Sequence, residues 1–324
     1  MRKKILQILW AVLMGLTVPG VIMGIAGNFA PEMPASLPNT AVPHETSVPE
    51  KKPGLWVLTE EQQLLWMDMN DYLTGVILAE MPTSFDEQAL QAQAVVARTY
   101  ALKRQQENRH ENGAVCTDSG CCQAYVSISD YLNGLGYPED VASAKQASEA
   151  TADLVITYGG ELIEATYFHS SGGRTEDAAA VWGVEYPYLQ TVESPGEEDM
   201  EHYTDRVFYS KEDLEKCLDR SLPGAPGSWL GWTTYTTGGG VESVLFAGVL
   251  YNGTAFRNDL GLYSTAFSFE PEGDGLWITT LGKGHRVGMS QCGAQAMALA
   301  GESWENIIAH YYPGTRIDKM EQVG

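Results

Sequence analysis

The hydrophobic positions of the chain begin with one long apolar run near the N-terminus. The 21 residues from Ile5 to Ile25 carry no charge, and basic residues occupy positions 2–4. About 20 apolar residues span a bilayer as a helix, and basic flanks stay on the cytoplasmic side. The pattern therefore predicts a single-pass anchor in the cell membrane with a cytoplasmic N-terminus. A cleaved signal peptide is the alternative, because residues 24–26 weakly resemble a cleavage site.

Proline then dominates the stretch 29–55, which has six prolines and few large apolar residues between them. Proline at this density favours extended, poorly packed chain, and at ~3.1 Å per residue the stretch reaches roughly 80 Å. We therefore expect three parts. Residues 1–28 form a cytoplasmic stub and membrane anchor, residues 29–55 an extracytoplasmic linker, and residues 56–324 one folded region.

Within the folded region, hydrophobic positions at helical spacing predict a short helix over Asp71–Ala79. Ser84 and Glu87 have the spacing of a capping box, and an alanine-rich face continues over Leu90–Lys103. Together they predict a second helix that follows the first closely. Two further helices are predicted at Gln291–Leu299 and Trp304–Tyr311.

Alternating hydrophobic positions predict strands between these helices. Leu154–Tyr158 and Leu162–Phe168 flank Gly159-Gly160, which is a hairpin signal. Further strands are predicted at Ser243–Tyr251 and Leu276–Thr280, and loops at Glu107–Tyr125 and Gly282–Gly288. Strands and helices do not alternate strictly, so the fold class is α+β. We expect mixed helices and mostly antiparallel strands in two lobes around a cleft.

Charge and cysteine content limit the classes of function that the chain can have. The formal net charge is −22 at pH 7, from 42 acidic and 20 basic residues. An excess of acid excludes nucleic acid as a partner, since binding it requires basic surface that displaces counterions. It also opposes adsorption to anionic lipid. Five cysteines are an odd number for an exported chain, which indicates a free thiol or a metal ligand.

Four groups of motifs follow one another between about residue 70 and residue 315. They are Ala79-Glu80-Met81-Pro82 with residues 92–100, His169 to Glu176, Trp182 with Tyr188-Leu189, and Gly284 to Gln291 with Tyr311 to Thr315. In this order they resemble the stage II sporulation protein D family, the lytic transglycosylases of endospore-forming bacteria. The family usually has Gly-His-Gly-Val-Gly-Met-Ser-Gln-Tyr-Gly in the last group. Here Arg286 and Cys292 replace the second glycine and the tyrosine.

The resemblance implies cleavage of the bond between N-acetylmuramic acid and N-acetylglucosamine in peptidoglycan glycan strands. It implies a preference for strands already stripped of stem peptides by an amidase. The place would be the septum and the engulfing membrane, in the space between mother cell and forespore. The implied partners are the glycan strands, a cell-wall amidase and a membrane scaffold of the engulfment machinery.

Glu80 is the expected catalytic acid and base. The negative end of its helix and apolar neighbours such as Leu78 and Met81 disfavour the charged carboxylate. A carboxyl protonated near neutral pH suits a general acid for a glycosidic oxygen. A hydrolase usually needs a second carboxylate, whereas a lytic transglycosylase uses the 6-hydroxyl of muramic acid and leaves a 1,6-anhydro end. The alternative is an exposed glutamate at a helix end.

Further polar residues of the motifs are expected to bind substrate. We expect Arg98 to reach the cleft from its apolar helix, with an internal ion pair as the alternative. Donors on loops suit sugar hydroxyls, and a helix N-terminus after a glycine-rich loop suits the lactyl carboxylate of muramic acid. Purely structural turns are the alternative for these loops. The loop candidates are His169, Ser170, Ser171, His285, Ser290 and Gln291.

The predicted loop Glu107–Tyr125, which we call the cysteine-containing loop, is expected to bind a metal. His110, Cys116 and Cys122 have the spacing His-x5-Cys-x5-Cys, and three soft ligands on a short polar loop suit zinc. The fourth ligand stays open between water, Asp118, Cys121 and Glu80. The alternative is a disulfide of Cys116 with Cys121 or Cys122, which an oxidising exterior allows. Cys217 and Cys292 are expected to be buried as small apolar groups.

We thus expect a lytic transglycosylase with zinc and without an organic cofactor. One alternative is a scaffold of the engulfment machinery that binds peptidoglycan without cutting it. The other is a zinc-dependent cell-wall hydrolase, although two thiolates without a nearby His-Glu-x-x-His motif favour a structural metal.

Overall fold

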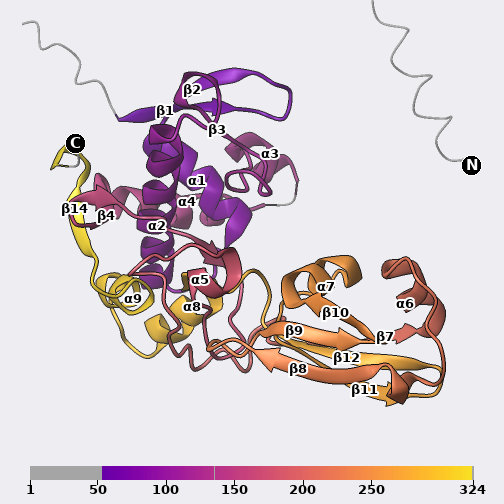
Figure 1. Cartoon of the computed structure of the whole chain (residues 1–324). Coiled ribbons are helices and arrows are strands. Elements are labelled where there is room, and N and C mark those ends of the chain that lie inside the picture. The colour runs from indigo at the N-terminus through magenta and orange to yellow at the C-terminus, as the bar shows by residue number, and fades with distance from the viewer. Residues whose placement is uncertain (1–52, 135, 323–324) are drawn as a thin grey trace, which may run out of the picture. The chain divides into compact units, whose positions relative to one another are not determined.

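The computed structural model describes residues 53–134 and 136–322 (Figure 1). The expected membrane anchor at 5–25 and all but the last residues of the expected linker lie outside the described residues. Within the described part, no helix is both long enough and apolar enough to cross a membrane. The folded region begins at Gly54, where the first strand starts.

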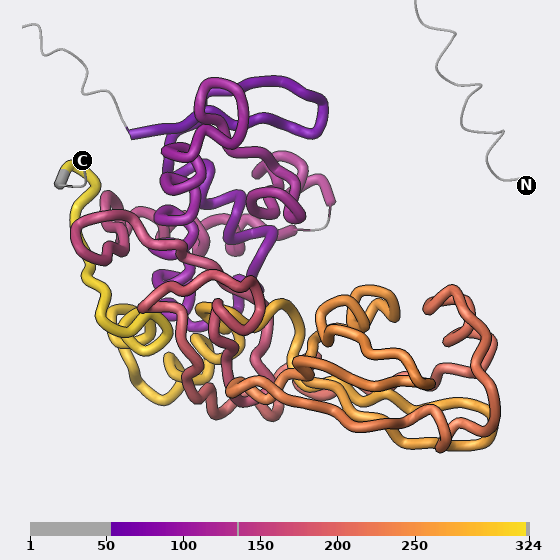
Figure 2. Tube along the Cα trace, viewed as in Figure 1, coloured from indigo at the N-terminus to yellow at the C-terminus, as the bar shows by residue number. Residues whose placement is uncertain are grey.

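The elements confirm a mixture of helices and mostly antiparallel strands (Figures 1 and 2). The helices are α1 (Met69–Glu80), α2 (Glu87–Gln106), α3 (Ile128–Asn133), α4 (Pro138–Ala150), α5 (Ala178–Trp182), α6 (Lys211–Cys217), α7 (Gly253–Leu260), α8 (Gln291–Leu299) and α9 (Trp304–Tyr311). The strands are β1 (Gly54–Leu58), β2 (Leu64–Asp68), β3 (Val115–Cys116), β4 (Leu154–Tyr158), β5 (Glu161–Leu162), β6 (Tyr167–Phe168), β7 (Thr204–Ser210), β8 (Leu230–Tyr235), β9 (Val241–Phe246), β10 (Val249–Asn252), β11 (Phe267–Glu272), β12 (Gly275–Leu281), β13 (Met289–Ser290) and β14 (Arg316–Lys319).

All four predicted helices are present as α1, α2, α8 and α9, and the last two have the predicted bounds. The predicted capping box of Ser84 and Glu87 is wrong. Asp86 caps α2 instead, because its carboxylate accepts a hydrogen bond of 2.9 Å from the backbone N–H of Gln88. A carboxylate one residue before the helix satisfies the free N–H groups of the first turn directly, so the more distant serine is not needed.

The described residues outside 204–281 form what we call the helical lobe, and helix α2 lies at its centre. It packs against α1, α4, α8, α9 and β4, and most of its side chains from Ala89 to Ala101 are buried. The alanines on α2 let its neighbours approach closely, so this helix fixes where the ends of α1 and α8 lie.

Two strand predictions need correction. The Gly159-Gly160 turn is present, but only β5 pairs with β4, and β6 pairs instead in parallel with β13. Apolar spacing cannot reveal that one extended run changes partner halfway. The run Ser243–Tyr251 is likewise two strands, β9 and β10, which form a hairpin around Ala247 and Gly248. The strand at Leu276–Thr280 is confirmed as β12.

Residues 204–281 form a second lobe, drawn mainly in orange in Figure 1. It contains two three-stranded antiparallel sheets, ordered β11-β12-β7 and β10-β9-β8, with helices α6 and α7. The lobe has its own aromatic core, in which the rings of Phe246, Phe256, Phe267 and Phe269 pack at centroid distances of 5.3–5.8 Å. Aromatic packing of this kind gives a small lobe a core that does not depend on α2.

A buried ion pair of the helical lobe binds the backbone of the second lobe. The guanidinium of Arg286 lies 3.1 Å from Glu176 and also donates to the carbonyl oxygen of Gly238 at 2.8 Å. Glu176 in turn accepts a hydrogen bond of 2.9 Å from the backbone N–H of Gly240. The turn between β8 and β9 is therefore held against the helical lobe. Arg286 has a φ of 64°, which explains physically why a glycine suits this position.

Candidate functional site

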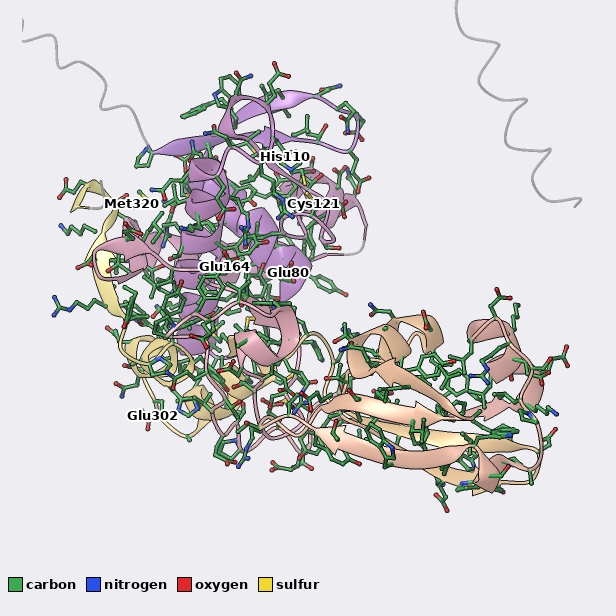
Figure 3. The ribbon with its side chains drawn as sticks, viewed as in Figure 1. Glu80, His110, Cys121, Glu164, Glu302 and Met320 are labelled. Atoms are coloured by element: carbon green, nitrogen blue, oxygen red, sulfur yellow. The ribbon has the colours of Figure 1, made fainter. Side chains whose placement is uncertain are left out.

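A cavity of about 1000 Å³ opens on the helical lobe. Its walls come from the end of α1, the C-terminal half of α2, the cysteine-containing loop, β6, α5 and residues 283–285. Figure 3 labels Glu80 and Glu164, two carboxylates of this wall. Among the described residues, none of the second lobe lines the cavity. The expected cleft between two lobes is therefore wrong, because the two lobes are joined by buried contacts instead.

Glu80 is the last residue of α1. The helix ends because Met81 takes an extended conformation, at φ −142° and ψ 136°, and Pro82 follows. The Oε1 atom of Glu80 accepts a hydrogen bond of 2.9 Å from the backbone N–H of Ala124. Burial raises the pKa of Glu80 more than this hydrogen bond lowers it. The carboxyl is thus oriented by the cysteine-containing loop and has an increased preference for its proton.

Gln123 holds Tyr167 in place next to Glu80. The Tyr167 hydroxyl donates to the Oε1 atom of Gln123 at 2.9 Å, and the Nε2 atom of Gln123 donates to the carbonyl oxygen of Ala97 at 3.3 Å. Hydrogen bonding from Tyr167 and from Gln291 lowers the pKa of Glu80, but burial raises it more. Burial is therefore the cause of the raised pKa.

Glu164 is a second carboxylate of the cavity, and the sequence interpretation missed it. Its side chain is 8% exposed and forms an ion pair with Arg104. Arg104 also pairs with Glu107 and lies 4.5 Å above the ring of Tyr100. The guanidinium therefore compensates the charge of Glu164. A role of this carboxylate as a nucleophile or base would have to compete with the ion pair. The available signal was a single acid inside the otherwise apolar run Leu162–Phe168.

His285 and Trp182 form an aromatic part of the wall. The two rings lie 5.3 Å apart, and Phe168 lies 5.6 Å from His285 on another side. Burial and the positive charge of Arg257 lower the pKa of His285 to about 4. Its Nδ1 atom accepts a hydrogen bond of 3.1 Å from Val287, so the imidazole is neutral and supports the Trp182 ring. Trp182 is 39% exposed, as a platform for a sugar ring requires.

His169 also lines the cavity, as the sequence predicts for a substrate-binding residue. Its Nε2 atom lies 3.2 Å from the carbonyl oxygen of Glu201, and its ring lies 5.7 Å from that of His202. Burial lowers the pKa of His169. A neutral imidazole at this position can exchange hydrogen bonds with a sugar hydroxyl without adding charge.

The two serines next to His169 do not reach the cavity. Ser171 is fully buried, and its hydroxyl and backbone N–H both bind the carboxylate of Glu197, at 3.0 and 2.7 Å. Ser170 is also fully buried, and its hydroxyl donates to the carbonyl oxygen of His202. Their expected role as sugar-binding donors is wrong, because the segment that carries them is covered by Glu197 and His202.

The other buried candidates have structural partners as well. Ser290 caps α8 through a hydrogen bond of 3.1 Å from the backbone N–H of Gly293, so that helix end is not free for an anion. Gln291 is 3% exposed and lies against Glu80 rather than in the open cavity. The expected cradle for a carboxylate at this helix N-terminus is therefore wrong.

Arg98 is fully buried and does not reach the cavity, so the expected substrate contact is wrong. Its guanidinium donates to the carbonyl oxygens of Ser148, Thr151 and Leu154, at 2.9, 2.8 and 3.1 Å. These carbonyls belong to the end of α4 and the turn that follows it. Arg98 thus satisfies carbonyl groups that α4 leaves without intrahelical partners. Burial lowers the pKa of Arg98 to about 10.

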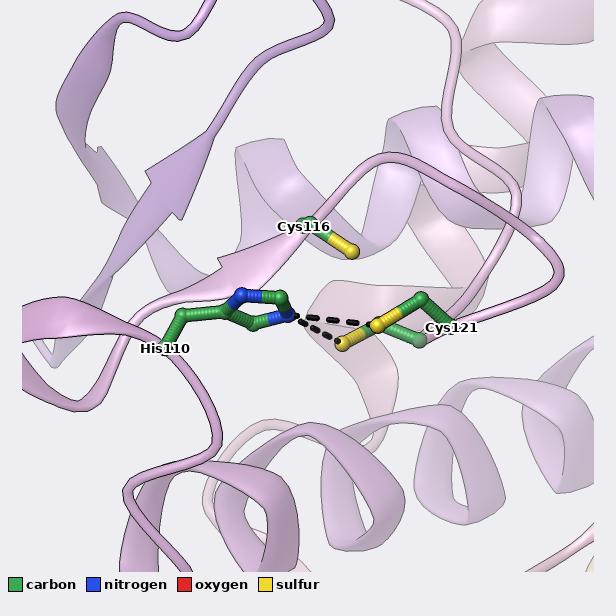
Figure 4. Close-up of side chains that lie close together, drawn as sticks. His110, Cys116 and Cys121 are labelled. Atoms are coloured by element: carbon green, nitrogen blue, oxygen red, sulfur yellow. Dashed lines mark hydrogen bonds between the residues drawn. The ribbon is translucent and has the colours of Figure 1, made fainter.

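The cysteine-containing loop brings together His110, Cys116, Cys121 and Cys122, whose ligand atoms all lie within 4.8 Å of one another. Figure 4 shows the Nε2 atom of His110 directed at two of the sulfur atoms, 3.3 Å from Cys121 and 3.6 Å from Cys122. The cysteines are free thiols, so the disulfide alternative is not formed here. The group includes Cys121 and neither Glu80 nor Asp118.

Three thiolates and an imidazole form a donor set that suits zinc or another soft divalent metal. Burial raises the pKa of Cys122 to about 12, so a metal that binds there has to displace a proton. Cys116 belongs to β3, which pairs with β1, and the other thiols follow a short turn. A metal at this group would tie the loop that supplies the Ala124 contact to the sheet.

Comparison with known proteins finds similarity over most of the chain. The family model of the stage II sporulation protein matches residues 59–158. Stage II sporulation protein D of Bacillus subtilis (strain 168) is 32% identical, over 81% of this chain and 78% of that protein. The protein of the same name from Bacillus amyloliquefaciens is 34% identical, over 78% and 75%. The amidase enhancer of Bacillus subtilis (strain 168) is 28% identical, over 76% of this chain and 40% of that protein.

Proposed function

The chain belongs to the stage II sporulation protein D family, and from this premise we infer that it is a lytic transglycosylase of peptidoglycan. The observation that carries the inference is the state of Glu80. Its carboxyl lies on the wall of a large cavity, is oriented by Ala124 and has a raised pKa. A carboxyl of this kind is suited to donate a proton to a glycosidic oxygen.

The proposed reaction uses Glu80 twice. The carboxyl first donates its proton to the oxygen between N-acetylmuramic acid and N-acetylglucosamine, and the bond from the anomeric carbon to that oxygen breaks. The 6-hydroxyl of the same muramic acid then forms a new bond to the anomeric carbon. The carboxylate takes the hydroxyl proton, which restores the acid and leaves a 1,6-anhydro end. Trp182 supports a sugar ring, and His169 contacts hydroxyl groups.

The biological setting follows from the relatives. We propose that the chain acts on the septal cell wall during sporulation and engulfment, and the names of its family members support the role in sporulation. Similarity to an amidase enhancer supports cooperation with a cell-wall amidase. The apolar segment 5–25 supports a place at the membrane, with the folded region outside. Membrane fractionation with and without that segment tests the location, and a full-length protein found in the soluble fraction would contradict it.

Hydrolysis is the competing reaction, because Glu164 supplies a second carboxylate in the same cavity. Its ion pair with Arg104 makes it a poor nucleophile, and therefore the transglycosylase reaction is favoured. A scaffold that binds glycan without cutting it is the other candidate. The raised pKa of Glu80 has no purpose in such a scaffold, which weighs against it.

Mass spectrometry of the products formed from glycan strands without stem peptides tests the reaction. We expect 1,6-anhydro ends from the unmodified protein and no products from Glu80→Gln. The matched variant Glu164→Gln should still form anhydro ends, although more slowly if Arg104 becomes misplaced. Reducing ends that disappear in Glu164→Gln would establish hydrolysis instead. Cutting at an unchanged rate by Glu80→Gln would remove Glu80 from the mechanism.

We further propose zinc as the metal of the cysteine-containing loop, held by His110, Cys116, Cys121 and Cys122. With four protein ligands a zinc ion supplies a structural cross-link and has no open position for an activated water. This donor set therefore disfavours a zinc-dependent hydrolase. Elemental analysis should find one zinc per chain, and Cys121→Ser should bind it more weakly. Metal-free protein that is equally stable to unfolding before and after addition of zinc would contradict the proposal.

A further inference from the structure

Residues 123–126, which we call the docked segment, lie against α1, the helix that ends at Glu80. The ring of Tyr125 stacks on that of Tyr72, with centroids 5.7 Å apart and ring planes at 9°. The backbone N–H of Val126 donates to the carbonyl oxygen of Gly75 at 3.2 Å. Positions 72 and 75 lie on one face of α1 because they are three residues apart. Helix α1 therefore holds the docked segment at two points.

Gly75 leaves the space that the docked segment occupies. A Cβ atom at Gly75 would lie 2.3 Å from the ring of Tyr125 and 2.6 Å from the carbonyl oxygen of Val126. Both distances are far shorter than a van der Waals contact, so a side chain at this position would push the docked segment away from α1. Glycine inside a helix is less favourable than alanine. Gly75 thus weakens the helix locally and admits the docked segment.

Gln123 anchors the start of the docked segment. Its side chain is 2% exposed, and its Nε2 atom donates to the hydroxyl of Tyr72 at 3.1 Å and to the carbonyl oxygen of Ala97 at 3.3 Å. Its Oε1 atom accepts from the hydroxyl of Tyr167 at 2.9 Å. These partners belong to α1, α2 and β6. The amide of Gln123 therefore fixes the docked segment against three elements at once.

The docked segment carries a hydrogen-bond donor for Glu80. The backbone N–H of Ala124 donates to the Oε1 atom of Glu80 at 2.9 Å. In the acid form the oxygen without the proton is the better acceptor, so this contact leaves the proton on Oε2. Tyr167 and Gln291 also form hydrogen bonds with Glu80, and both are uncharged near neutral pH because burial raises the pKa of Tyr167. The place of the proton therefore depends on the docked segment.

We propose that Gly75 and Gln123 are positioning residues of the transglycosylase reaction, because they hold the docked segment where Ala124 orients the carboxyl of Glu80 and keeps its proton on Oε2. The proposal rests on the proposed function. Neither Gly75 nor Gln123 lines the cavity, so both act through Glu80. After Glu80 has given its proton to the glycosidic oxygen, the same N–H stabilises the carboxylate until it takes the proton of the 6-hydroxyl.

Two variants disturb the docked segment in different ways. Gly75→Ala adds a Cβ atom under it, and Gln123→Met removes the amide at similar side-chain volume. Gly231→Ala is the matched control, because a Cβ atom there would lie 2.7 Å from the carbonyl oxygen of Leu245 in the second lobe, outside the cavity. For each full-length protein, glycan cleavage is measured from acidic to alkaline pH. Hydrogen exchange of the Ala124 amide reports the contact independently of activity.

We expect both variants to lower kcat about tenfold and to change KM less than about twofold, since the acid is misplaced and the cavity is intact. Loss of a donor to the carboxylate raises the pKa of Glu80 further. Activity requires the acid form, so it should persist to a pH about one unit higher than in the unmodified protein. The Ala124 amide should exchange about tenfold faster. Gly231→Ala should lower Tm and leave the pH profile of activity unchanged.

Three results would overturn the positioning role alone. They are unchanged exchange of the Ala124 amide in both variants, faster exchange with an unchanged pH profile, and a rise in KM at unchanged kcat. A loss of activity that is equal at every pH, with Tm lowered as in Gly231→Ala, would likewise assign Gly75 and Gln123 to the fold only. Absence of anhydro ends from the unmodified protein would overturn the proposed function and this assignment together.

Discussion

Replacing Arg286 by methionine tests how strongly one buried ion pair holds the fold together. The side chain is 2% exposed and its partner Glu176 is fully buried. The guanidinium also donates to the carbonyl oxygens of Ser171, Arg174 and Gly238, at 2.6, 2.8 and 2.8 Å. Methionine fills similar space but offers no donor, so the variant leaves an uncompensated carboxylate and three carbonyl groups without this partner.

Removal of one member of a buried ion pair costs about 3–5 kcal/mol of folding free energy. Two donors stay with Glu176, the hydroxyl of Thr236 and the backbone N–H of Gly240, both at 2.9 Å. They stabilise the remaining charge, so the lower end, about 3 kcal/mol, is expected. For a folded region of this size, that corresponds to a fall of roughly 6–12 °C in Tm.

Urea unfolding followed by circular dichroism measures the loss, and a double-mutant cycle with Glu176→Gln isolates the pair. The double variant contains no buried charge at this place, so it should lose at least about 1 kcal/mol less than the two single variants together. The reasoning would be refuted if Arg286→Met cost under about 1 kcal/mol, or if the two losses simply added. A loss under about 1 kcal/mol would mean that neither the charges nor the carbonyl contacts of Arg286 stabilise the fold much, and simple additivity would mean that the carbonyl contacts, rather than the charges, hold Arg286.

Other changes have expected outcomes that are quicker to measure. Because burial raises the pKa of Glu80 above its unfolded value, its favourable effect on stability is present at low pH and lost as pH rises through the folded pKa. Glu80→Gln should therefore stabilise the protein against urea at pH 8 and not at pH 4; an equal effect at both pH values would contradict the burial argument. Arg98→Met should lower the free energy of unfolding by about 3 kcal/mol without changing glycan affinity, because the partners of Arg98 are carbonyl groups around the end of α4. A selective loss of glycan affinity at unchanged Tm would show that Arg98 contacts the substrate. Trp182→Ala should weaken glycan binding by about 1–2 kcal/mol, measured by calorimetry, whereas Trp182→Phe should retain most of it; equal losses would show that the ring is not a platform.

The sequence predicted helices well where one face, or the whole helix, is apolar. The bounds of α8 and α9 follow from serine caps and apolar spacing, and both of these signals are local. By contrast, α4 was not predicted. Its buried side consists of small residues, Ala144, Ala147 and Ser148, whose hydrophobicity differs little from that of the exposed side. Contact with α1 and α2, together with the Arg98 contacts at its end, supplies what its own pattern lacks.

The candidate site residues also divide into those that the local sequence reveals and those that only packing decides. The position of Glu80 at a helix end next to proline, and the His-x5-Cys-x5-Cys spacing, are properties of neighbouring residues that a sequence displays. Whether a polar side chain faces the cavity or the core is decided by contacts between distant segments. The Ser171 hydroxyl donates to Glu197, and the Arg98 guanidinium donates to carbonyl groups around the end of α4. Neither side chain is therefore free to bind substrate.

The sequence by itself thus determined the helices α1, α2, α8 and α9, the catalytic candidate Glu80 and three of the four clustered metal-ligating side chains. Only the tertiary structure decided that Glu164 shares the cavity with Glu80 and that Cys121 completes the cluster. The reason is physical. Spacing along the chain reports which residues share one element, whereas burial and charge compensation depend on which elements pack together.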